Sequence, residues 1–64
     1  MKMMLGDYCL AELCAAHSGN GYHAMTFGDT DYRRVAASLD GAQKCLLANL
    51  LAAARPLVKW EGEA

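Results

Sequence analysis

The second half of the chain carries apolar residues that recur every three or four positions, which is the spacing of one face of an α-helix. The stripe consists of Val35, Leu39, Ala42, Leu46, Leu50 and Ala53. Asp29 or Thr30 is suited to cap the start of such a helix, and Pro56 is suited to end it. The pattern therefore predicts one long helix over residues 30–55.

Residues 4–17 are a second amphipathic segment when they are placed on a helical wheel of about 100° per residue. Leu5, Cys9 and Leu13 fall on one half of the wheel, and the acidic residues fall on the other. Ser18 and two glycines follow, and these residue types favour the end of a helix and a turn. This segment predicts a short helix.

Two such helices predict an all-α fold, a helical hairpin in a single domain over residues 1–64. Residues 57–64 are expected to be a loosely ordered tail. At 1.5 Å per residue the long helix measures about 37 Å and the short one about 21 Å. Part of the long stripe therefore lacks a cover within the chain, and we expect a homo-oligomer, most simply a two-fold dimer. The expected interface residues are Leu39, Gln43, Leu46, Leu47, Leu50 and Leu57.

The connection over residues 18–29 is longer than the roughly 2–8 residues that usually join two helices. Its second half reads YHAMTF, which is not the composition of a flexible linker. In one interpretation residues 22–27 are extended, with Tyr22, Ala24 and Thr26 on one side, and pair with a second copy across the dimer. In the other they form an irregular lid.

Charge and cysteine content limit the classes of function. Six basic residues face seven acidic ones, for a net charge of −1, and a balance of this kind argues against a nucleic-acid interface. No apolar run approaches the ~18 residues of a membrane span. Asp7 and Glu12 interrupt the first apolar stretch, and the three cysteines cannot all pair with one another. We therefore expect a cytoplasmic protein with reduced cysteines and no membrane association.

Catalysis and metal binding find little support in the sequence. No local pattern joins a cysteine, a histidine and an orienting carboxylate, so we expect no enzymatic activity. Cys9, Cys14, His17 and His23 are zinc-type ligands, but Cys9 would lie about 140° from Cys14 around a helix. We therefore expect no metal and no cofactor.

Aromatic and basic side chains gather around the expected start of the long helix. The candidate binding residues are Tyr22, His23, Phe27, Tyr32, Arg33 and Arg34. Tyrosine and arginine often dominate the energy of protein–protein interfaces, and arginine also pairs with phosphate. The first interpretation is a small interaction module, of the kind that mobile elements carry, which binds and modulates or inhibits a protein partner. The alternative is an oligomer that binds a small phosphate-bearing nucleotide. A third interpretation is structural, with aromatic residues that cap the hairpin core.

Overall fold

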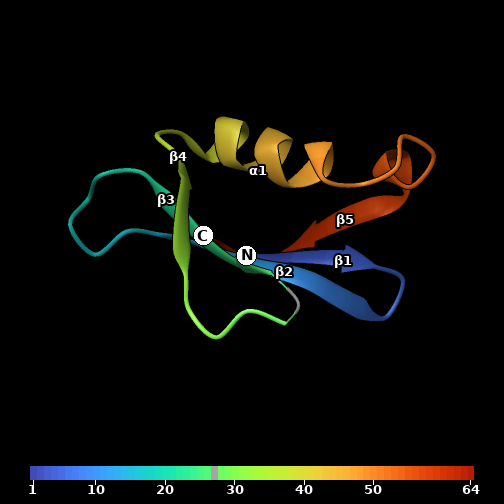
Figure 1. Ribbon diagram of the computed structural model, residues 1–64, viewed down its shortest axis with the longest axis horizontal. Helices are drawn as coiled ribbons and strands as arrows, with labels where there is room; N and C mark the ends of the chain where they lie inside the picture. The colour runs from blue at the N-terminus through green and yellow to red at the C-terminus, as the bar shows by residue number, and fades with distance from the viewer. Residues whose placement is uncertain (27) are drawn as a thin grey trace.

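The computed structural model describes residues 1–26 and 28–64. This part of the chain forms a five-stranded antiparallel sheet and one α-helix (Figure 1). In chain order the elements are β1 (Lys2–Leu5), β2 (Tyr8–Ala15), β3 (Tyr22–Thr26), β4 (Arg33–Ala36), α1 (Leu39–Ala48), the 3-10 helix η1 (Arg55–Leu57) and β5 (Val58–Glu61). The strands lie side by side in the order β4, β3, β2, β1, β5. The all-α helical hairpin predicted from the sequence is therefore wrong.

The first two strands form a hairpin where the sequence predicted a helix over residues 4–17. Leu5 and Tyr8 are paired, and Gly6 and Asp7 make the turn between them. Gly6 has a φ of 60°, which the tight two-residue hairpin turns require and which a residue without a Cβ adopts at little cost. Gly-Asp between two apolar runs is a known hairpin signal. The glycine that would weaken the start of a helix thus reverses the direction of the chain.

A β-bulge in β2 obscures the alternation that would otherwise indicate a strand. Met3 is opposite Ala11 and Met4 is opposite Cys9, so Leu10 is an extra residue in β2. Leu10 and Ala11 both line a hollow beneath α1. Two successive residues on one face break the period of two by which a strand is recognised. The same apolar residues therefore fit a helical wheel as well.

Strand β3 confirms the extended interpretation for residues 22–26, whereas Phe27 lies outside the described residues. The strand pairs with β2 and β4 of its own chain rather than with a second copy. Gly21 precedes it with a φ of 87°, and a Cβ at this position would come within 2.7 Å of the carbonyl oxygen of Ala36. Only glycine allows β4 to approach the start of β3 so closely.

Helix α1 begins nine residues later than the sequence predicted, at Leu39. The side chain of Ser38 caps it and accepts a hydrogen bond from the Gly41 N–H at 3.1 Å. Residues 33–36 are strand β4 instead, so the predicted helix over residues 30–55 is wrong in its first third. Val35 belongs to this strand, and only the middle of the apolar stripe is helical.

Helix α1 also ends early, at Ala48. The Arg55 Nε donates to the carbonyl oxygens of Leu47 at 3.0 Å and Leu50 at 3.3 Å. The Leu47 carbonyl also accepts from the Leu50 N–H at 3.0 Å, so Arg55 adds a side-chain bond to the turn that ends the helix. The chain then turns through η1 into β5, so the segment expected to be a loosely ordered tail contains a strand.

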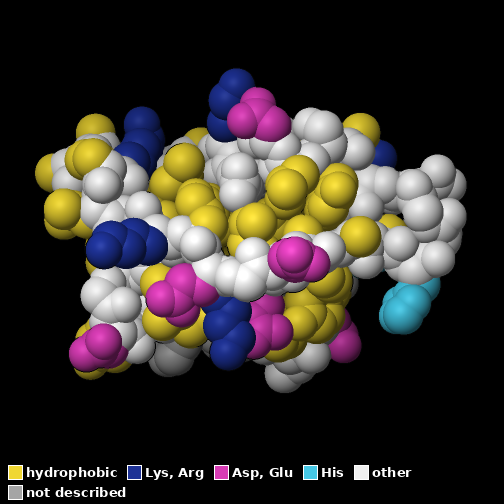
Figure 2. Space-filling view, turned by 180° about the vertical axis from the view of Figure 1, so that it is seen from behind, with side chains coloured by type: hydrophobic (Ala, Val, Ile, Leu, Met, Phe, Trp, Pro, Cys, Tyr) yellow, Lys and Arg dark blue, Asp and Glu magenta, His cyan; other side chains and the backbone are white. Residues whose placement is uncertain are grey.

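The core lies between α1 and one face of the sheet. Helix α1 leaves β4 at one edge of the sheet and lies across that face, and the chain returns as β5 at the other edge (Figure 1). The buried residues of this core are Met3, Ala11, Leu13, Ala24, Ala42 and Leu46. Figure 2 shows apolar side chains gathered below the helix. Within the described residues, no helix is long and apolar enough to span a membrane.

Most of the residues expected at an oligomer interface pack within the chain. Leu46 is buried in the core, and Leu39, Leu47 and Leu50 are partly buried against it. Gln43 Nε2 donates to the sulfur of Met1 at 3.1 Å, and Leu57 is the exposed member of the set. The predicted long helix with an uncovered apolar stripe is wrong, because α1 has only 10 residues and its apolar face covers the sheet.

The position of the core predicts which leucine the fold depends on. Leu13→Ala should lower the free energy of unfolding by about 2–5 kcal/mol, because Leu13 is 1% exposed and its loss leaves a cavity. A domain of this size has about 3–5 kcal/mol in all, so the variant should be largely unfolded. Leu51→Ala is the matched control, since Leu51 is 81% exposed. It should change the free energy of unfolding by less than about 0.5 kcal/mol. Urea denaturation followed by circular dichroism measures both, and an equal loss in the two variants would contradict this core.

The start of α1 gives a second prediction. Ser38→Ala should cost about 0.5–2 kcal/mol, because it removes the acceptor for the Gly41 N–H. Thr30→Ala, at the start expected from the sequence, should have little effect, since Thr30 is exposed and outside any helix. Denaturation of the two variants decides between the two helix starts. A larger loss for Thr30→Ala would favour the long helix.

Candidate functional site

The face of the sheet opposite α1 is covered by no helix in the described part of the chain (Figure 1). Residues directly opposite one another in antiparallel strands share a face, so the strand register identifies the side chains on this surface. We call it the open face. It comprises Lys2, Met4, Cys9, Glu12, Cys14, His23, Met25, Arg34, Lys59 and Glu61.

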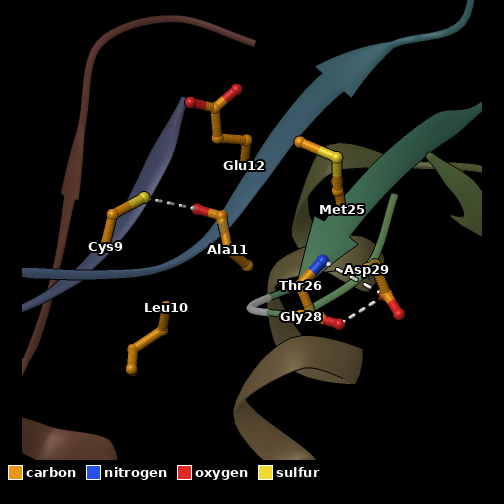
Figure 3. A pocket seen from close by; sticks show the side chains of 8 residues that line it. All are labelled: Cys9, Leu10, Ala11, Glu12, Met25, Thr26, Gly28 and Asp29. Carbon is orange, nitrogen blue, oxygen red and sulfur yellow. Dashed lines mark hydrogen bonds between the residues drawn. The ribbon is translucent and has the colours of Figure 1, made fainter. Parts of the chain in front are cut away.

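Opposite charges alternate across the open face. Glu12, on the central strand β2, lies opposite Lys2 on one side and Met25 on the other. Lys2 in turn lies opposite Glu61. Figure 3 shows Glu12 and Met25 extending to one side of the strands and Leu10 to the other. In Figure 2, basic and acidic side chains lie next to one another below the apolar band. The open face is therefore mixed in charge and partly apolar.

Tyr32 reaches onto this face from the connection that precedes β4. Its hydroxyl donates to Glu12 Oε2 at 2.8 Å, and the residue remains 41% exposed. The hydrogen bond to the carboxylate raises the pKa of Tyr32, because it stabilises the neutral phenol. Tyr32 also lines an open depression of about 490 Å³ with Cys14, His23 and the turn between β2 and β3. The hydroxyl of Tyr32 is thus held by Glu12 while part of the residue stays accessible.

The turn that follows β3 is held by Asp29 rather than by the start of a helix. Asp29 Oδ2 accepts hydrogen bonds from the Thr26 hydroxyl and from the Thr26 N–H (Figure 3). The hydroxyl bond is the larger cause that lowers the pKa of Asp29. Asp29 therefore acts through its side chain in a turn, as Asp often does, and directs the chain toward Tyr32. A shallow hollow of about 230 Å³ lies beside it, between β2 and the end of β3.

The structure brings together only part of the predicted binding cluster. His23, Tyr32 and Arg34 share the open face, whereas Tyr22 is half-buried against the core and Phe27 is outside the described residues.

The two arginines are separated by the geometry of the strand. Arg33 and Arg34 are successive residues of β4, so their side chains leave opposite faces of the sheet. Arg34 is close to Gly21, where an added Cβ would lie 3.1 Å from its Nε. A two-pronged clamp made by this pair is excluded.

Sequence reasoning missed the residues that β1 and β2 bring to the open face, among them Lys2, Glu12 and Cys14. The available signal was the charged Glu12 between Ala11 and Leu13, since one polar residue between two buried ones is typical of a strand.

The described residues contain no group of three or more His, Cys, Asp or Glu side chains placed to hold a metal ion. Cys9, Cys14 and Cys45 are free thiols. Of the four residues of zinc-binding type in the sequence, Cys14 and His23 lie opposite one another on neighbouring strands, and His17 is in the turn. Two neighbouring ligands do not make a structural zinc site, which takes four.

Comparison with known proteins gives no match: no family model, curated protein or solved structure is significantly similar to this chain. The function is therefore argued from the geometry of the open face.

The Tyr32–Glu12 bond predicts a pH dependence of stability. The raised pKa of Tyr32 means that the folded state holds the phenolic proton more tightly than the unfolded state does. The contribution is complete below the unfolded pKa of about 10 and is lost as the pH rises through the folded-state value. Glu12→Gln should move the pKa back toward about 10. NMR titration of the tyrosine ring carbons measures the shift, with Tyr32→Phe to assign the signal. A pKa that is the same in both proteins would contradict the bond.

Proposed function

We propose that this chain is a non-catalytic interaction module that binds and modulates a protein partner through its open face. The observation that carries the proposal is the Tyr32 hydroxyl held by Glu12 at 2.8 Å while the residue stays 41% exposed. Exposed tyrosines are frequent sources of binding energy at protein interfaces. A tyrosine already held in place loses less freedom when a partner binds.

The surroundings of Tyr32 support a protein partner. Cys14 and His23 line the same depression as Tyr32 and are half-buried, as is Met25 on β3, whereas Arg34 and Lys2 are exposed. Protein–protein interfaces combine partly buried apolar side chains with polar and charged ones that stay accessible. Because both signs of charge are present, the partner surface that fits this face also carries both. Binding modulates the partner by occupying that surface.

A nucleotide ligand receives no such support. Arg33 and Arg34 lie on opposite faces of β4. Among the described residues that line the depression beside Tyr32, there is no lysine or arginine to neutralise a phosphate. The open face therefore favours a protein partner over a nucleotide.

A photo-crosslinking amino acid at position 32 tests the proposal, and position 44 is the control. Lys44 lies on the outer surface of α1 with a side chain 75% exposed, away from the open face. A partner should be crosslinked from position 32 and not from position 44, and unlabelled protein should compete.

Variants of the open face then measure the contribution of Tyr32 to the affinity for the captured partner. Tyr32→Ala should weaken binding by at least about tenfold, and Lys44→Ala should leave it unchanged. Isothermal calorimetry with the purified partner gives both affinities. Crosslinking from position 44 alone, or equal affinity of the Tyr32→Ala variant, would contradict the proposal.

A further inference from the structure

Strand β5 is an outer strand of the sheet and has no neighbour on its far side among the described residues. The hydrogen bonds of β1 show which backbone groups of β5 point toward β1 and which point outward. Met1 exchanges hydrogen bonds with Leu13 of β2 at 2.7 and 2.8 Å. Because these groups alternate in direction along an antiparallel strand, those of Lys2 and Met4 are aimed at β5. The N–H and C=O of Trp60, which lies opposite Met3, are therefore aimed outward.

The sequence of β5 is complementary to itself in the antiparallel direction. If Trp60 is placed opposite Trp60 of a second copy, Lys59 lies opposite Glu61 and Glu61 lies opposite Lys59. Val58 then lies opposite Gly62. Lys59 and Glu61 are both exposed in the single chain. Two opposite-charge pairs thus form at the same time as the free backbone groups of Trp60 find partners.

We propose that two copies of this chain associate through β5 and form one continuous antiparallel sheet across a two-fold axis. The occupant of the edge is a second copy, because the alternation of Lys59 and Glu61 matches its own reverse. This inference is independent of the protein partner proposed for the open face. Leu57, which precedes the strand, is 63% exposed and adds apolar surface at the same edge.

The other outer strand, β4, does not have this property. It reads Arg33, Arg34, Val35, Ala36 and has no acidic residue to face its arginines in a second copy. Positive charge on an outer strand is a common protection against edge-to-edge pairing. Association is therefore directed to one edge, which gives a closed dimer rather than a fibre.

The proposed two-fold axis places the open faces of both copies on the same side of the joined sheet. Residues directly opposite in an antiparallel pair point to the same face, so both copies of α1 lie on one side of the joined sheet. The two open faces lie on the other side as one surface. The dimer then presents two Tyr32 side chains, one from each copy, at a fixed spacing.

Self-association of the unmodified protein is measured first, by sedimentation equilibrium and by the emission of Trp60, the one tryptophan of the chain. A reversible monomer–dimer equilibrium is expected, and dilution should shift Trp60 emission to longer wavelength as its outer side becomes hydrated. A protein that remains monomeric from micromolar to millimolar concentration would overturn the proposal.

Charge reversal tests the register. Lys59→Glu and Glu61→Lys should each weaken self-association by about tenfold or more, because each turns two attractive cross-strand pairs into repulsive ones. An equimolar mixture of the two variants should associate as a heterodimer, since every pair across the axis is again of opposite charge. Failure of the mixture to associate, or undiminished self-association of either variant, would overturn the register.

Matched controls distinguish the effect of a charge at the β5 edge from the effects of net charge and of unfolding. Lys44→Glu and Asp40→Lys make the same changes in charge on the outer surface of α1, where the two residues form an exposed ion pair at 3.0 Å, and should leave the dimer unchanged. Glu61→Lys also places two lysines opposite each other within the chain, at Lys2. Glu61→Gln avoids this repulsion and should weaken the dimer less than the reversal does. Circular dichroism establishes that each variant is folded.

Discussion

Helix α1 packs against the sheet through a completely buried Ala42, and the rest of the structure depends on this contact. Ala42 shares one buried cluster with Ala11 and Ala24 of the strands, whose small side chains suit close packing, and with the larger Met3, Leu13 and Leu46. The contact also joins distant segments, because β4 enters α1 at one edge of the sheet and β5 leaves it at the other. The outer strands are also held by pairing, β4 with β3 and β5 with β1.

In the described part of the chain one α-helix covers one face of the sheet, and the other face is the open face. Its chemistry differs from that of the core, since polar and charged side chains from neighbouring strands lie in line. Glu12 illustrates the connection between fold and function. It is fixed on the central strand by its neighbours Ala11 and Leu13, both buried, and so provides a rigid anchor for Tyr32. The proposed binding surface is thus organised by the same strand that fills the core.

The sequence predicted the candidate site only in part. His23, Tyr32 and Arg34 were grouped because they are close in the sequence, and the structure places His23 opposite Arg34 and in one depression with Tyr32, while their role in binding stays a prediction. Glu12 was missed because its distance from Tyr32 is 20 residues along the chain, and only the pairing of β2 with β3 brings it near. Arg33 was grouped with Arg34 because the two are adjacent in the sequence. In a strand, adjacent side chains point to opposite faces, so the two arginines are separated.

Some features follow from the local sequence alone. The helical spacing of Leu39, Ala42 and Leu46 correctly indicated a helix in that region, and the extended interpretation of residues 22–26 was also correct. The long helix and the short helix were both wrong, because apolar residues at positions such as 5, 9, 10 and 13 fit a helical wheel and a bulged hairpin equally well. Local spacing cannot decide between them, since a strand is stable only when it pairs with another. The pairing of β1 with both β2 and β5 decided it, and that pairing exists only in the folded chain.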